Sequence, residues 1–209
     1  MNRFTFEAGV GGLASSSKNK APRQREPLVL ELIPENLLRE PIEYIFADHY
    51  RLRQIIATMD RLLTEGVYAQ PPTDEAIAAD MAVIHAYLRD ELSPHIADEE
   101  DDLFPRLELR SPADNETKQI LATLHQEHEE DLALIQPLVS GHADLLAGKP
   151  AANKELFETS VVRFVETQRR HIVWENNIIL PLARRRFSVE DMEEIGRDMA
   201  ARRGLKYPA

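Results

Sequence analysis

One eleven-residue pattern occurs twice in the chain, and it constrains the fold more than any other feature. The copies begin at His95 and at His171, and both read His-Ile-x-x-Glu, with a proline ten residues after the histidine. Residues four apart on an α-helix project from nearly the same face. The imidazole of each histidine and the carboxylate of Glu99 or Glu175 can therefore converge on one metal ion. Two such pairs, brought together, would form a site for two metal ions.

Apolar residues at helical spacing predict four long helices around these motifs. Residues that open or cap helices place their beginnings near Pro41, Thr73, Ser111 and Asn153. The last helix is expected to reach Arg186. Proline removes a backbone hydrogen bond, so Pro94 is expected to bend or break the second helix and Pro137 to kink the third. The stripes expected to face inward include Phe46, Leu132, Leu156 and Ile178.

Two further histidines, His49 and His128, lie in the middle of the apolar stripes of the first and third helices. Each follows an acidic residue, Asp48 or Glu127, and each precedes one copy of the repeated pattern at a similar distance along the chain. The chain therefore resembles a duplicated helical hairpin. We predict an all-α fold, an up-down-up-down four-helix bundle.

The ends of the chain differ in composition from this central part. Residues 1–39 are interpreted as an N-terminal arm, partly flexible, in which the short apolar runs at 28–30 and 37–38 lie across the bundle as a strap. The bundle itself is expected over residues 40–186. Residues 187–209 are expected to form a short C-terminal helix and tail, with Ser188 and Asp191 at the start of that helix.

The metal hypothesis rests on several histidines and carboxylates at one level of the bundle. A single histidine on an apolar stripe is most often a satisfied core residue, but several unpaired buried imidazoles and carboxylates would cost several kcal/mol together. The predicted ligands are His49, His95, Glu99, His128, His171 and Glu175. His125 is a further candidate, and otherwise a residue beside the site or partly exposed. His85 and His142 are interpreted as surface or packing residues.

Composition excludes several classes of function. The net charge of −11 argues against nucleic acid as a partner, because neutralising phosphates needs a basic face. No apolar run approaches the ~20 residues that span a bilayer, and the N-terminus lacks the apolar core of a signal peptide. The chain has no cysteine, hence no disulfide, so we expect a cytoplasmic protein without membrane association.

The ordered set of histidines and glutamates resembles the hemerythrin-like proteins of the HHE cation-binding family over roughly residues 40–186. This resemblance implies a non-haem di-iron centre inside a four-helix bundle, with histidines as terminal ligands and the two glutamates as bridges. The oxygen-carrying members have two histidines four apart on the third helix and an aspartate as the last carboxylate. Here His125 and His128 are three apart and the last carboxylate is Glu175, which argues against reversible oxygen carriage.

We therefore expect two iron ions joined by an oxo or hydroxo bridge, although manganese or zinc suits the same ligand types. The predicted function is to bind or sense oxygen, nitric oxide or redox state, with a small diatomic molecule as the partner of the metal centre. The alternatives are a di-iron oxidase or peroxidase-like enzyme, an iron-handling protein, and a bundle with zinc or no metal that serves as an interaction scaffold. A ferritin-like oxidase is disfavoured, because the chain has no Glu-x-x-His pair.

Overall fold

The computed structural model of the protein describes residues 27–208, and over that range the chain is all-helical and contains no strand. The helices of the first half are η1 (Glu35–Arg39), α1 (Pro41–Thr64), η2 (Val67–Ala69), α2 (Glu75–Asp90), α3 (Leu92–Ala97), η3 (Asp98–Leu103) and α4 (Phe104–Leu109). Those of the second half are α5 (Asn115–Leu146), α6 (Lys154–Trp174), η4 (Glu175–Ile179), α7 (Leu180–Arg186) and α8 (Val189–Arg202). Within the described range, no helix is both long and apolar enough to traverse a lipid bilayer.

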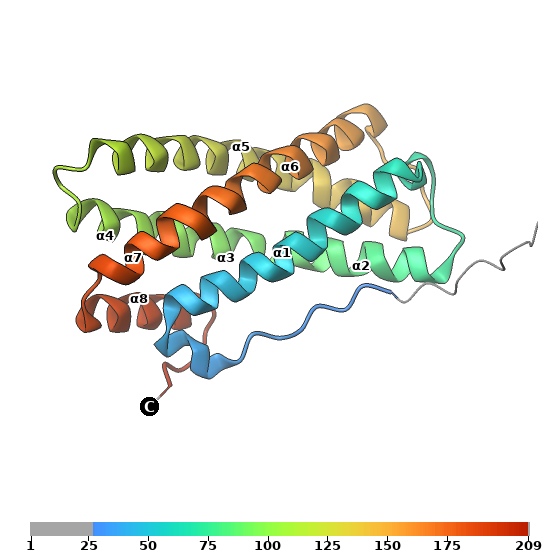
Figure 1. The fold of residues 1–209 in the computed structure, drawn as a ribbon. Coiled ribbons are helices and arrows are strands. Elements are labelled where there is room, and N and C mark those ends of the chain that lie inside the picture. The colour runs from blue at the N-terminus through green and yellow to red at the C-terminus, as the bar shows by residue number, and fades with distance from the viewer. Residues whose placement is uncertain (1–26, 209) are drawn as a thin grey trace, which may run out of the picture.

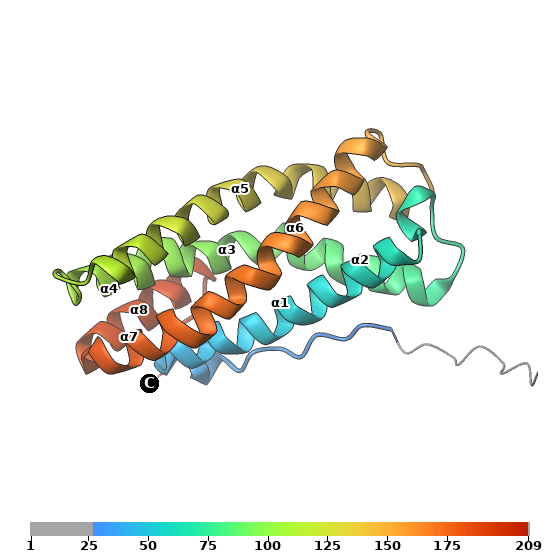
Figure 2. The same ribbon diagram turned by 45° about the horizontal axis from the view of Figure 1, so that its top comes forward.

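The long helices lie side by side along the length of the molecule (Figures 1 and 2). Two of them are the continuous helices α1 and α5. The others are composite: α2, α3, η3 and α4 follow one another in one rod, and α6, η4 and α7 in another. Helix α6 packs against both α1 and α5, and α5 packs against α2.

The two prolines that fall inside predicted helices have different effects. Helix α2 ends at Asp90, four residues before Pro94, which has no N–H to donate to that carbonyl, and α3 begins at Leu92. The predicted bend or break is therefore a break. In contrast, α5 continues through Pro137.

The starts of the helices follow side-chain capping. Asp74, Asn153 and Ser188 accept backbone N–H bonds at the starts of α2, α6 and α8. The prediction for the third helix was wrong by one turn. Its N-cap is Asp114, which accepts the N–H of Thr117 at 3.0 Å, whereas Ser111 accepts a hydrogen bond from the Arg186 guanidinium instead.

The predicted strap is present in the described part of the arm, residues 27–39. Leu28 and Leu30 pack against the core, and the backbone N–H of Leu28 donates to Oδ1 of the buried Asp80 at 2.6 Å. Leu38 is fully buried, but the chain around it forms the short helix η1 rather than an extended segment. The remainder of the predicted arm, residues 1–26, lies outside the described range.

The apolar core consists of two clusters separated by a polar layer. One cluster includes Leu52 and Ile172, and the other includes Ile45 and Ile179. On α1, His49 lies between Ile45 and Leu52, so the predicted metal ligands fall between the clusters. Four residues assigned to inward stripes are instead exposed, because each lies at the margin of a stripe wider than the buried face. They are Phe46 (46% exposed), Leu132 (46%), Leu156 (49%) and Ile178 (40%).

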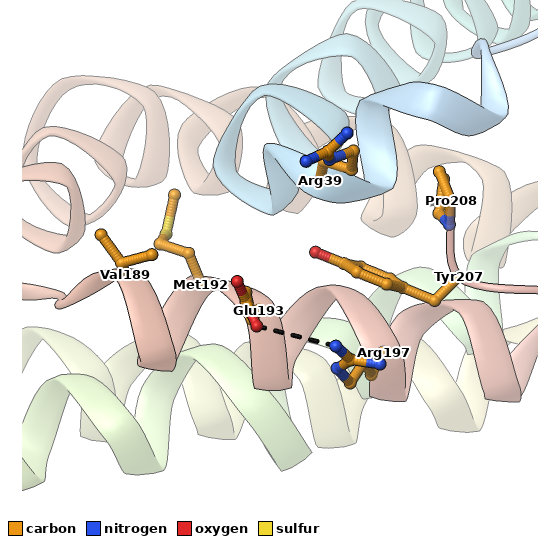
Figure 3. A pocket seen from close by; sticks show the side chains of 7 residues that line it. All are labelled: Arg39, Val189, Met192, Glu193, Arg197, Tyr207 and Pro208. Atoms are coloured by element: carbon orange, nitrogen blue, oxygen red, sulfur yellow. Dashed lines mark ion pairs between the residues drawn. The ribbon is translucent and has the colours of Figure 1, made fainter.

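Helix α8 closes one end of the molecule and is attached through charged pairs. Asp191 completes a capping box with Ser188 and accepts two hydrogen bonds from Arg110, each 2.9 Å long. A surface hollow of about 540 Å³ lies between η1 and α8, where Arg197 sits over the ring of Tyr207 (Figure 3). None of its lining residues is a predicted metal ligand.

We expect Asp191→Ala to lower the free energy of unfolding by roughly 1–3 kcal/mol, because charge-assisted hydrogen bonds to Arg110 and the Ser188 N–H are lost. Hydrogen bonds from Arg110 hold the pKa of Asp191 below its usual range. A carboxyl whose pKa is lowered on folding stabilises the protein above its unfolded pKa, and this contribution is lost as the pH falls.

The difference between wild type and variant in urea unfolding should therefore be full at neutral pH and shrink below about pH 4. Glu193→Ala is the matched control, since Glu193 is an exposed residue of the same helix that pairs only weakly, at 3.6 Å, with Arg197. Equal stability losses in the two variants would contradict the assigned role of Asp191.

Candidate metal centre

One buried cluster of imidazoles and carboxylates at the polar layer is formed by residues of α1, α3, η3, α5, α6 and η4. The structure brings together all six side chains predicted as ligands, and none is more than 2% exposed. We call these residues the His/Glu cluster: His49 of α1, His95 of α3, Glu99 of η3, His128 of α5, His171 of α6 and Glu175 of η4.

Both glutamates lie in short π-helical segments that the sequence did not predict. In each segment the residue before the motif's proline donates its N–H five residues back, from Phe104 to the Glu99 carbonyl and from Leu180 to the Glu175 carbonyl. The following proline has no N–H and its ring crowds the preceding turn, which favours this wider turn. In both copies of the repeated pattern, the π-helical turn at the glutamate thus comes just before the proline.

The donors of the second half of the chain form one group with Glu99. One donor atom from each of Glu99, His128, His171 and Glu175 lies within 4.8 Å of the others. His128 Nε2 is 3.3 Å from Glu99 Oε2, and His171 Nε2 is 3.0 Å from Glu175 Oε1. We call this set the C-terminal group.

A second set, which we call the N-terminal group, shares Glu99 with the first. One donor atom from each of His49, His95 and Glu99 lies within 4.8 Å of the others. His49 Nε2 is 3.1 Å from Glu99 Oε1 and 3.2 Å from Glu175 Oε2. Two groups with a carboxylate in common could hold two neighbouring cations.

The buried carboxylates provide a test of whether a metal fits. Neither oxygen of Glu175 makes a hydrogen bond, and the same holds for Glu99 Oε2. Imidazole nitrogens lie between 3.0 and 3.6 Å from these oxygens without proper hydrogen-bond geometry. Unpaired buried carboxylate oxygens are costly, and cations among them would remove that cost. The donor set therefore fits metal ions that accept nitrogen and oxygen ligands.

The electrostatics of the cluster show how strongly its charges interact. Burial alone would lower the pKa of His49, but the carboxylates of Glu175 and Glu99 outweigh burial and raise it to about 10. For His128, Glu100 and Glu99 likewise outweigh burial and raise the pKa to about 9. Burial and the charge of Glu99 would raise the pKa of Glu175, yet His171 and His49 lower it to about 2. Without metal, Glu99 and Glu175 are therefore anionic at neutral pH, and the imidazoles of His49 and His128 are cationic.

A second layer of oxygen atoms surrounds the cluster. Each of the four imidazoles directs Nε2 inward and places Nδ1 near an oxygen of another helix. His95 Nδ1 lies 3.3 Å from Asp48 Oδ2, and His171 Nδ1 lies 2.9 Å from Glu127 Oε2. These acids directly precede the lone histidines His49 and His128. Their matched positions in the sequence were therefore a sign that both acids lie beside the cluster, although the spacing of the ligands did not reveal their partners.

The residues that follow the two glutamates contact the lone histidines. His128 Nδ1 lies 2.6 Å from Glu100 Oε1, and His49 Nδ1 lies 2.8 Å from Asn176 Oδ1. The polar neighbours of the cluster thus follow the same internal duplication as the cluster itself, although His95 Nδ1 makes no hydrogen bond. Such partners fix ring orientation and raise the basicity of the inward nitrogen.

The remaining histidines lie outside the cluster. The side chain of His125 is 59% exposed, with Nδ1 2.6 Å from Glu100 Oε2, so it contacts the second layer rather than the six inner side chains. His85 is partly exposed. His142 is fully buried against the rings of Tyr68 and Phe157, a packing role.

One buried polar pair was missed by the sequence analysis. Gln168 donates to Asp131 Oδ2 at 2.6 Å, and both side chains are buried. Burial raises the pKa of Asp131 to about 6, despite the hydrogen bond from Gln168. They lie three residues from His128 and His171, about one helical turn from the cluster. The corresponding positions in the first half are the apolar Leu52 and Leu92, so the surroundings of the two groups differ.

Side chains in contact with His128 cover the cluster on one side. The ring of Phe104 stacks on His128, with ring centroids 5.7 Å apart. A surface hollow of about 240 Å³ is lined in part by Phe104, Glu100 and His125. Two residues in contact with His128 thus separate this hollow from the cluster.

Comparison with known proteins agrees with this geometry. The family model described as the hemerythrin HHE cation binding domain matches residues 40–183, a span that includes the whole His/Glu cluster. No curated protein matches the chain. The match covers well over half of the sequence, and the chain therefore belongs to the hemerythrin HHE cation-binding domain family.

Proposed function

We propose that this protein binds two iron ions in the His/Glu cluster and uses them to bind or sense oxygen, nitric oxide or redox state. The observation that carries this proposal is the pair of buried donor groups that share Glu99. When bound, the irons supply open coordination positions for a small ligand and a change of oxidation state. Manganese or zinc would also suit these donors.

The six cluster residues have distinct roles in this proposal. The C-terminal group, with His128, His171 and Glu175, would hold one ion, and His49 with His95 would hold the other. Glu99 belongs to both groups and Glu175 approaches His49, which supports a bridging role for both carboxylates. His125 is not proposed as a ligand, because its nearest carboxylate contact lies in the second layer.

The surrounding fold restricts what can reach the ions. The cluster is almost fully buried between two apolar clusters, and Phe104 covers His128. This arrangement supports a small ligand and not a larger organic substrate. We further propose that residues 40–186 act as an up-down-up-down four-helix bundle around the centre. Residues 1–39 would be an N-terminal arm and residues 187–209 a terminal helix and tail, in a cytoplasmic protein.

Absorption spectroscopy tests the proposed function directly. Protein reconstituted with ferrous salt and exposed to air should acquire charge-transfer bands, and these should shift when azide or nitric oxide is added. Absorption bands that are unchanged by both azide and nitric oxide would contradict ligand binding at the metal centre. Turnover of peroxide by the loaded protein would instead favour the enzymatic alternative.

We expect His95→Ala and His171→Ala each to bind fewer than two ions per chain and to lose the stabilisation that metal confers. The reason is that metal binding and folding are thermodynamically linked. Metal analysis and thermal unfolding with and without ferrous ion measure both effects. His85→Ala is the matched control, because His85 lies on α2 outside the cluster. Full metal content in either cluster variant would contradict the ligand assignment.

Metal affinity should rise with pH. An imidazole binds metal only in its neutral form, whereas the pKa values of about 10 for His49 and about 9 for His128 keep both protonated at neutral pH in the metal-free protein. Zinc, as a redox-inert probe, should therefore release at least two protons per chain at neutral pH, measured with a pH indicator. Its affinity should weaken as the pH falls. Binding without proton release would contradict these protonation states.

A further inference from the structure

The internal duplication of the second layer is broken at one pair of positions. His128 and His49 occupy equivalent places in the two halves, and each places Nδ1 against the residue that follows a cluster glutamate. That residue is Glu100 for His128 and Asn176 for His49. A charged carboxylate thus faces one imidazole, whereas a neutral amide oxygen faces the other.

The other two second-layer contacts do not cancel this difference. Glu127 accepts a hydrogen bond from His171, and Asp48 lies near His95, so each group has one carboxylate from this source. Both acids also pair with arginines, Glu127 with Arg170 and Asp48 with Arg51. The imidazoles of the C-terminal group therefore have two carboxylate partners, and those of the N-terminal group have one.

The inner donors differ only in spacing, because Glu99 and Glu175 each approach an imidazole of both groups. The C-terminal group brings four donor residues within 4.8 Å of one another, and the N-terminal group brings three. A carboxylate that accepts from Nδ1–H increases electron density at Nε2, the nitrogen that binds metal. Losing such an outer partner typically costs 10–100-fold in metal affinity.

We propose that the two metal positions are unequal, that the C-terminal group fills first, and that Glu100 and Asn176 set much of the difference. This inference rests on the proposed function, since it requires that both groups bind metal. Neither residue would be a ligand. Each would be a positioning residue that acts through the imidazole it contacts.

An isosteric exchange at these two positions tests the inference. Anaerobic titration of the full chain with ferrous ion, followed by calorimetry, should resolve a tight and a weak step in the wild type. Glu100→Gln should weaken the tight step by about 10-fold or more, and Asn176→Asp should strengthen the weak step by a similar factor. The double variant should bring the two steps closer together or reverse their order.

Two controls connect each step to its group. Glu100 also contacts the exposed His125, so His125→Gln should leave both steps unchanged if the effect passes through His128. His95→Ala should keep the tight step and lose the weak one, whereas His171→Ala should lose the tight step. Circular dichroism of the metal-free variants establishes that each is folded.

The outcomes separate this inference from the proposed function. The inference would be overturned if the wild type bound both ions with equal affinity, or if the exchange variants left the affinity of both steps unchanged. Two-metal binding would remain intact in either case. A tight step that survives His171→Ala would overturn the assigned order of filling. A wild-type chain that binds no ferrous ion would overturn the proposed function itself.

Discussion

The constraint on which the structure depends is the burial of two carboxylates, Glu99 and Glu175, in the middle of an apolar core. Neither side chain is exposed, and three of their four oxygens lack a hydrogen bond. In the metal-free chain only the imidazoles around them compensate the charge, which explains the raised pKa values of His49 and His128. The two apolar clusters on either side keep water away, and this makes the compensation necessary.

The backbone at the two glutamates reflects the same requirement. A π-helical turn at Glu99 and another at Glu175 each end at a residue directly before a proline. Such π-helical turns are rare, and they appear frequently at functional sites. Their occurrence at both copies of the repeated pattern shows that the duplication extends from the sequence to the backbone.

Much of the centre could be predicted from the sequence, because ligand spacing on a helix depends only on helical geometry. The positions of His95 and Glu99 belong to that class, and the structure brings them together as expected. The second layer could not be predicted in the same way. The contact between Asp48 and His95 joins two helices, so it depends on the rotation of each helix about its axis. The same uncertainty explains why Phe46, at the margin of an apolar stripe, is exposed.

The two halves of the centre are also supported differently from outside. Asp98, directly before Glu99, accepts hydrogen bonds from Arg202 and Arg203 near the end of α8, three of them between 2.5 and 2.9 Å. The equivalent residue before Glu175 is Trp174, which is 39% exposed. One glutamate is therefore attached through its neighbour to the terminal helix, and the other is not. Because Glu99 belongs to both donor groups, displacement of α8 would alter the two groups together.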